Sequence, residues 1–191
     1  IFKGKATVQN GQFEISFIVP NSMSSSNLAA LKLQLYAYND TVDAIFQNQS
    51  VYIQGVATQN NKDTIGPDIK AYINTPYFKS GDWVSSPANL IVELRDSAGI
   101  QSSGNELGHD LKLIVDDTLM TSYNLNSFFT YDLNQYQSGL IQYALPVLSQ
   151  GKHRLIIKAW DLLGNISKDT FDLIVQVTRE IIDEVKPVRT F

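Results

Sequence analysis

The 191-residue sequence predicts an all-β protein. Short runs of alternating apolar and polar side chains recur along it, as in strands with one buried face. Residues 31–38 show the pattern, with leucine and alanine on one face and lysine, glutamine and tyrosine on the other. Glycine, asparagine, aspartate and proline separate the runs where strands would end and turn. Hydrophobic residues make up 43% of the chain, enough for a packed core.

The N-terminal third predicts only part of a sheet structure. Residues 2–8 and 13–19 are expected to be strands joined by Asn10-Gly11, because both of these residues accept positive φ. Further strands are predicted at 31–38 and 51–56. We interpret residues 1–60 as a partial β-sandwich, the end of an upstream domain whose exposed edges a neighbouring domain would cover. The chain begins at Ile1 without an initiator Met, so it is expected to be a piece of a longer protein.

The polar segment 59–63 is the best candidate domain boundary, and Gly66-Pro67 then restarts the strand pattern. Strands are predicted at 68–74, 89–95, 110–115, 128–131, 139–145, 153–160 and 170–177. About seven strands in about 115 residues fit an immunoglobulin-like antiparallel β-sandwich, which we place at residues 61–178. Residues 179–191 are interpreted as a tail or linker, in which Pro187 limits any helix.

Charge and cysteine content exclude several classes of function. The formal net charge is −4, the pI is about 5.1, and lysine and arginine are scattered. Nucleic-acid binding and polybasic membrane attachment are therefore not expected. The absence of cysteine excludes disulfides, thiolate metal sites and a cysteine nucleophile within these residues. No apolar run approaches the roughly 20 residues of a membrane-spanning helix, so direct membrane insertion is not expected.

His109-Asp110 is the one adjacent pair that suggests catalysis, with Ser102 or Ser103 as nucleophile. Triads are assembled in space rather than by adjacency, and no Gly-x-Ser-x-Gly turn occurs. We favour a turn entering a strand, with Asp110 capping backbone amides and His109 packed or exposed. His109 and His153 are too few for a typical zinc site. The sequence thus predicts no catalytic residue, no cofactor site and no metal ligand.

Acidic residues gather near the predicted strand ends, namely Asp63, Asp68, Asp96, Asp116, Asp117 and Asp161. Extracellular sandwiches can hold calcium with six to eight such oxygens at an inter-domain pole. There is no Asp-x-Asp-x-Asp loop, and aspartate at a strand end more often forms an Asx turn. Turn formation is therefore the favoured reading, and calcium is the alternative.

Aromatic side chains form two sequence clusters that suggest sugar binding. They are Tyr77, Phe78 and Trp83, and then Tyr123, Phe128, Phe129, Tyr131 and Tyr136. Exposed rings stack on sugar faces, but aromatic residues more often fill a core or brace a loop. Core or loop packing is the favoured interpretation. Trp160 does not alternate with the apolar residues before it, so we expect its ring to pack at a strand end.

An ordered set of motifs resembles one family over roughly residues 1–178. It includes Asp63-x-x-Gly66-Pro67-Asp68-Ile69, Gly104-Asn105-x-Leu107-Gly108-His109-Asp110, Asp132-x-x-x-Tyr136-Gln137-Ser138-Gly139, and Trp160-Asp161 with Gly164-Asn165. These motifs resemble the C-terminal, non-catalytic region after the peptidase domain in PorU-like sortases. Those sortases are gingipain-type cysteine peptidases of the type IX secretion system in Bacteroidota. The turn at 162–165 is less polar than the family pattern.

The resemblance implies a function for the parent protein rather than for these residues. The family's catalytic Cys and His belong to the upstream peptidase domain, and no position here matches them. The parent would be exported to the outer-membrane surface, remove C-terminal sorting domains from secreted cargo, and help attach that cargo to lipopolysaccharide. This chain would brace the peptidase domain of the same chain, or contact cargo and secretion partners. The alternative is a carbohydrate-binding or adhesive β-sandwich module of a secreted protein.

Overall fold

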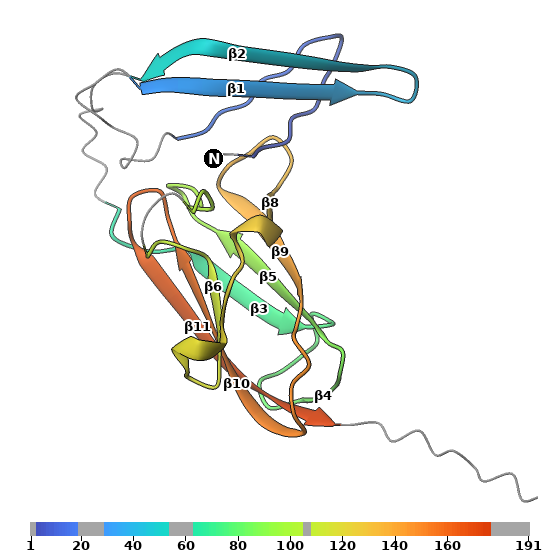
Figure 1. Ribbon diagram of the computed structural model, residues 1–191, viewed down its shortest axis with the longest axis vertical. Helices are drawn as coiled ribbons and strands as arrows, with labels where there is room; N and C mark the ends of the chain where they lie inside the picture. Colours follow the sequence, from blue (N-terminus) through green and yellow to red (C-terminus); the bar gives the residue numbers. More distant parts are fainter. Residues whose placement is uncertain (1–2, 19–28, 54–62, 105–107, 177–191) are drawn as a thin grey trace, which may run out of the picture.

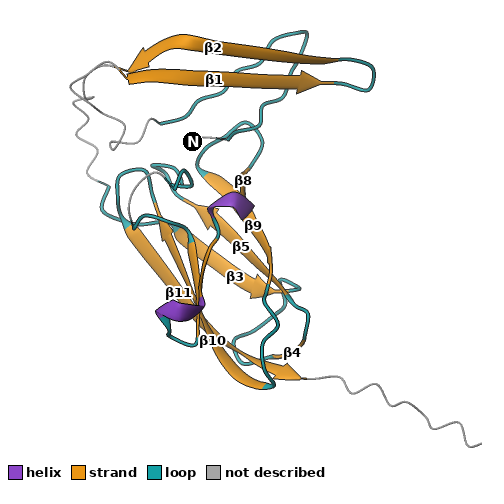
Figure 2. Cartoon of the chain, in the orientation of Figure 1, coloured by secondary structure: helices purple, strands orange, loops and turns teal. Residues whose placement is uncertain are grey.

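The computed structural model of the chain describes residues 3–18, 29–53, 63–104 and 108–176. Within these ranges the strands β1 to β11 form three sheets, accompanied by two three-residue 3-10 helices, η2 (Leu119–Thr121) and η3 (Asn126–Phe128). The all-β prediction is confirmed, and loops make most of the connections between strands (Figure 2). No described helix is long and apolar enough to cross a bilayer.

β1 (Ala29–Tyr38) and β2 (Asp43–Ile53) form a two-stranded antiparallel sheet, called here the hairpin. It lies at one end of the long axis of the molecule (Figure 1). The predicted strand at 31–38 is confirmed. The strand predicted at 51–56 begins earlier, at Asp43, because the polar residues at 47–50 hide the alternation from the sequence. Residues 54–56 lie outside the described ranges.

The strands predicted at 2–8 and 13–19 are wrong in their described part. Residues 3–18 contain only isolated pairings, between Lys5 and Leu133 and between Gln9 and Gln12. The turn between them is confirmed, since Asn10 has φ 51° and Gly11 has φ 77°. Alternation makes a strand only where another strand supplies a ladder. In the described part of the chain, no strand flanks most of residues 3–18.

The remaining strands form two larger sheets, called here the two-sheet body. One sheet has the order β3-β5-β9-β8, with strands β3 (Asp68–Ile73), β5 (Asn89–Arg95), β9 (Ser138–Ala144) and β8 (Phe129–Tyr131). The other has the order β4-β11-β10-β6-β7, with strands β4 (Trp83–Ser85), β11 (Ile166–Gln176), β10 (Gly151–Trp160), β6 (Lys112–Val115) and β7 (Ser122–Asn124). Every pairing is antiparallel except that of β4 with β11.

A single hydrophobic core joins these two sheets. Alternate residues of β5, such as Leu90 and Val92, are buried, and so are Leu155 and Ile157 of β10 in the facing sheet. All of them belong to one cluster of buried side chains. Burying a side chain of this size stabilises the fold by roughly 1.5–3 kcal/mol. The period-2 pattern therefore places the core between the sheets.

The predicted strands of the body are confirmed within a few residues at each end. The sequence missed two strands, β4 and β7, which have three residues each and are too short to show alternation. The boundary predicted at 59–63 lies outside the described ranges except for Asp63. The tail predicted at 179–191 lies wholly outside them.

Candidate functional site

Three carboxylates from separate loops meet at one end of the two-sheet body. Asp63 precedes β3, Asp96 follows β5 and Asp161 follows β10. One oxygen from each lies within 4.8 Å of the others. Sequence reasoning had placed all three near strand ends but could not show that they converge. This group, called here the carboxylate cluster, is the densest set of acidic groups among the described residues.

Hydrogen bonds to neighbouring turns account for much of the carboxylate cluster. Asp161 is fully buried, and its oxygens accept from the Leu163 amide at 2.9 Å, the Asn165 amide at 2.7 Å and Asn165 Nδ2 at 2.7 Å. Asp96 accepts from the Ala98 amide at 2.7 Å. Asp63 accepts from the amide two residues ahead, Ile65, at 3.0 Å. Each aspartate thus fixes the turn that follows its strand or loop, as predicted from Asx-turn chemistry.

Asp96, a member of the carboxylate cluster, has a shifted pKa. Burial raises the pKa of Asp96 above its usual value, and the charges of Asp161 and Asp63 raise it further. Amide hydrogen bonds from Ala98 and Gly99 partly offset this rise. The ionised Asp96 is therefore less stable in the folded protein than in water.

Few carboxylate oxygens of the carboxylate cluster are free of hydrogen bonds and able to bind a cation. Calcium takes six to eight oxygen ligands, whereas both oxygens of Asp161 already accept hydrogen bonds from Asn165. The other acidic candidates lie elsewhere: Asp68 is exposed at the start of β3, and Asp116 and Asp117 pair with His153 and Arg154. Calcium binding stays the alternative to turn formation, and Asp63, Asp96 and Asp161 are the residues to which it would apply.

His153 is buried at the start of β10 between two hydrogen-bond acceptors. Its Nδ1 lies 2.8 Å from Asp116 Oδ2, and its Nε2 lies 2.8 Å from the carbonyl oxygen of Ser149. Because both partners can accept, the geometry suits the protonated ring, in which both nitrogens donate. Burial by itself would lower the pKa of His153, but the bonds to Asp116 and Ser149 outweigh it and raise the pKa.

The group Asp116, His153 and Ser149 superficially resembles a catalytic triad. Ser149 Oγ lies 3.4 Å from His153 Nε2, at the long end of the hydrogen-bond range. A general base needs a free lone pair on that nitrogen. Here Nε2 lies 2.8 Å from the Ser149 carbonyl oxygen, which can only accept. The ring therefore joins the loop before β10 to the turn after β6.

His109 and its neighbours do not form the triad considered from the sequence. The His109 ring stacks on Trp160, with centroids 4.0 Å apart and planes inclined by 26°. The hydroxyl of Ser102 donates to Tyr131 at 3.1 Å, and that of Ser103 donates to Gln101 at 2.9 Å. The packed His109 and the Trp160 ring at a strand end agree with the sequence interpretation.

Asp110 has side-chain partners among the described residues. Within the described residues its carboxylate accepts from the side-chain amide of Asn126 at 2.9 Å and pairs with Lys112 at 3.7 Å. Asn126 also accepts from the backbone next to Asp110, since Leu111 N donates to Asn126 Oδ1 at 2.7 Å. The expected capping of backbone amides by Asp110 stays a prediction. Asn126 lies 16 residues further along the chain from Asp110, so no local signal could have revealed it.

The aromatic side chains divide between the core and the surface. Phe129 and Tyr131 are buried, and Phe78 packs edge-on against Phe171, as favoured from the sequence. Trp83 and Tyr77 are exposed, at 62% and 87% respectively. The first sequence cluster therefore supplies the two most exposed of these rings, and Phe128 of the second cluster is 44% exposed.

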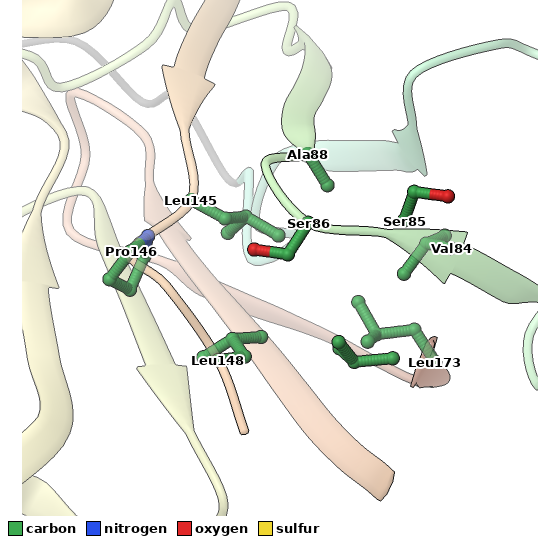
Figure 3. Close-up of a pocket in the computed structure, with 9 residues that line it drawn as sticks. Val84, Ser85, Ser86, Ala88, Leu145, Pro146, Leu148 and Leu173 are labelled. Atoms are coloured by element: carbon green, nitrogen blue, oxygen red, sulfur yellow. The ribbon is translucent and has the colours of Figure 1, made fainter. Parts of the chain in front are cut away.

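Two hollows lie among the described residues, and neither brings together a pair of ionisable side chains. The first is an apolar cavity of about 10 Å³ between the ends of β4 and β11, lined by Val84, Leu145, Leu148 and Leu173 (Figure 3). Such a volume holds at most a single water molecule. The second is an open hollow of about 700 Å³, and Glu14 is the sole ionisable residue of its lining. A lone carboxylate provides no acid–base pair.

Taken together, the described residues form a β-rich region in which many polar side chains fix turns. Among solved structures, the chain matches the crystal structure of dimeric latent PorU from Porphyromonas gingivalis. The two share 31% sequence identity with a TM-score of 0.59, over 94% of this chain and 16% of the PorU chain. The resemblance to PorU expected from the sequence motifs is confirmed, for a region that makes up a small part of that protein.

Other comparisons add no functional argument. The endo-β-1,4-mannanase from Thermotoga petrophila matches with 12% identity and a TM-score of 0.38, over 58% of this chain and 20% of that chain. A match at that level supports neither a shared fold nor a shared activity. No protein-family model matches the chain, and no curated protein matches it.

Proposed function

We propose that this chain is a non-catalytic region of a PorU-like, cell-surface sortase of the type IX secretion system. The similarity to PorU over 94% of the chain is the observation that carries this proposal. The region would brace the peptidase domain of the same protein, or contact cargo sorting domains and other secretion proteins. The sequence is consistent with this role, because a cysteine peptidase needs a nucleophile that these 191 residues lack.

The domain organisation is part of the same proposal. Residues 1–60 would be the end of an upstream β-sandwich, residues 61–178 an immunoglobulin-like sandwich, and residues 179–191 a tail. The strand orders of the body support the second unit. The order β3-β5-β9-β8 corresponds to strands A, B, E and D of an immunoglobulin fold, and β11-β10-β6 corresponds to G, F and C.

A peptidase assay tests the central claim. The 191-residue chain and the longer protein that contains it are each incubated with a cargo protein that carries a C-terminal sorting domain. We expect cleavage by the longer protein and none by the chain alone. Cleavage by the chain alone would end the proposal, as would a longer protein that contains no peptidase domain.

The exposed rings of Tyr77 and Trp83 favour the alternative of carbohydrate binding. Stacking of a sugar on Trp83 would quench its fluorescence, while Trp160 is already stacked on His109. A titration with polysaccharides compares the wild type with Trp83→Ala. Saturable quenching that disappears in the variant would favour the carbohydrate-binding module over the sortase region.

A further inference from the structure

We infer that the β1–β2 hairpin is an incomplete sheet, whose outer β2 edge and apolar faces are covered by the polypeptide that precedes this chain in the longer protein. The inference rests on the proposed function, since it requires a longer PorU-like protein. It adds to that proposal by assigning an interface to particular residues.

The first argument is the unprotected edge of β2. Within the described residues neither β1 nor β2 pairs with a third strand, so each leaves one row of backbone amides and carbonyls unpaired. Natural edge strands are protected by charge, proline or short length. β2 has 11 residues, contains no proline, and carries no charge after Asp43.

The edge strands of the two-sheet body, unlike β2, are either short or charged. β4, β7 and β8 have three residues each. The fourth edge strand, β3, carries Asp68 and Lys70, and Lys70 pairs with Glu93 at 3.1 Å. The body is thus protected against edge-to-edge pairing, whereas β2 retains a continuous edge that can accept another strand.

The second argument is that both faces of the hairpin carry exposed apolar side chains. Opposite residues in an antiparallel pair lie on the same face, and successive residues lie on opposite faces. Ile45 pairs with Tyr36 on one face, and Phe46 pairs with Leu35 on the other. Ile45 and Phe46 are exposed at 72% and 51%. A hairpin with two such faces is marginally stable by itself.

These features identify a permanent partner rather than a transient one. Charge depletion is typical of the buried centre of an interface, and obligate interfaces are the more hydrophobic class. A single bound peptide strand would pair with one edge and leave both faces in water. Covering the edge and the faces together requires a folded neighbour, such as another sheet of the same protein.

The position of the hairpin indicates which part of the longer protein lies near enough to cover it. The chain spans 16% of PorU, and the match covers 94% of the chain, so most of the hairpin falls within the matched region of a much longer protein. The described chain starts between the hairpin and the body, where Lys5 pairs with Leu133 of the loop after β8, while β11 ends at the opposite end of the body (Figure 1). In the proposed longer protein, polypeptide that precedes the chain would therefore enter between the hairpin and the body.

Hydrogen–deuterium exchange on the longer protein and on the 191-residue chain tests this assignment. In the longer protein, we expect the amides of β2 that point away from β1 to exchange at least about tenfold more slowly than in the chain alone. The amides of β10 should exchange equally in both, and they serve as the internal reference. Equal exchange of the β2 amides in the two proteins would overturn the inference.

A matched pair of substitutions supplies the second readout. Ile45→Lys places a charge on the hairpin, and Val147→Lys places one in the loop before β10, where the side chain is 88% exposed. In the longer protein, Ile45→Lys should lower the thermal midpoint by several degrees, and Val147→Lys should leave it unchanged. In the chain alone both should be neutral. A neutral Ile45→Lys in the longer protein would overturn the inference.

A second copy of the chain could also cover the hairpin. Light scattering, which measures the oligomeric state of the chain alone, tests this alternative. If the chain alone is a dimer whose outward β2 amides are already protected, the partner is another copy and the inference is wrong. Failure of the proposed function would look different. A longer protein that lacks a peptidase domain would remove the sortase assignment, while the exchange of the β2 amides would still report on the hairpin.

Discussion

The hairpin and the two-sheet body use the same strand pattern with opposite results. In the body, alternating side chains from two sheets meet in one core, where Leu90 and Leu155 are fully buried. In the hairpin the same alternation leaves Tyr36 and Ile45 more than half exposed. Alternation therefore specifies a strand with an apolar face but does not supply the surface that covers it.

This difference predicts where the stability of the isolated chain resides. A sheet becomes independently stable when it has three or more strands with a covered apolar face. The body meets this condition with sheets of four and five strands, and the hairpin does not. Substitutions of the same kind should therefore have different effects in the two regions.

The largest contrast is expected for leucine truncation. Leu155→Ala removes a fully buried side chain from β10, and it should lower the free energy of unfolding by about 2–5 kcal/mol. Leu33→Ala is the same change at a 37% exposed position of β1, and it should cost less than about 1 kcal/mol. Urea unfolding of both variants measures the contrast. Equal losses would show that the hairpin has a core of its own within the chain.

A smaller contrast is expected for two glycines with positive φ. A Cβ at Gly99, whose φ is 94°, would lie 2.7 Å from the Tyr136 ring, whereas at Gly11, whose φ is 77°, it would meet nothing within 4 Å. Gly99→Ala should therefore add a steric clash to the backbone strain and cost about 2–4 kcal/mol. Gly11→Ala should carry only the strain, about 1–2 kcal/mol. Thermal unfolding that shifts equally in the two variants would contradict the packing around Gly99.

The buried His153 should make the stability of the body depend on pH. The folded pKa of His153 is raised, so its contribution is fully present below the unfolded value near 6.5 and is lost as the pH rises through the folded pKa. The free energy of unfolding should fall by on the order of 1 kcal/mol across that window. His153→Gln should remove the dependence, which urea unfolding at pH 6 and pH 8 measures. An unchanged slope in the variant would refute the bridge to Asp116 and Ser149.

The smallest effect is expected at the carboxylate cluster. The folded pKa of Asp96 is raised, so ionisation lowers stability as the pH rises through that value. Asp96→Asn keeps an acceptor for the Ala98 amide without the charge, and it should stabilise the chain by about 1 kcal/mol at pH 7. The gain should vanish near pH 3, where the carboxyl is protonated in both states. A loss of stability at pH 7 would indicate that the charge is needed, as for a bound cation.

Much of the fold could be predicted from local sequence. Alternation located the strands of the body, and Asn10-Gly11 predicted a turn that the structure contains. These features depend on near neighbours, because side-chain direction repeats every two residues and turn φ values depend on single residue types. The prediction of strands on either side of Asn10-Gly11 was wrong for a different reason. Pairing needs a distant partner, which residues 3–18 mostly lack among the described residues.

Only the tertiary structure decided the polar sites. His153 and Asp116 are 37 residues apart, and the carboxylate cluster joins three loops that are distant in sequence. Such pairs leave no periodic signal, since their distances follow from sheet order and register rather than from spacing along the chain. By itself the sequence determined strands, turns, the absence of cysteine and the resemblance to PorU. The packing of the sheets determined that His153 is a buried bridge, because its two acceptors come from different loops brought together by β6 and β10.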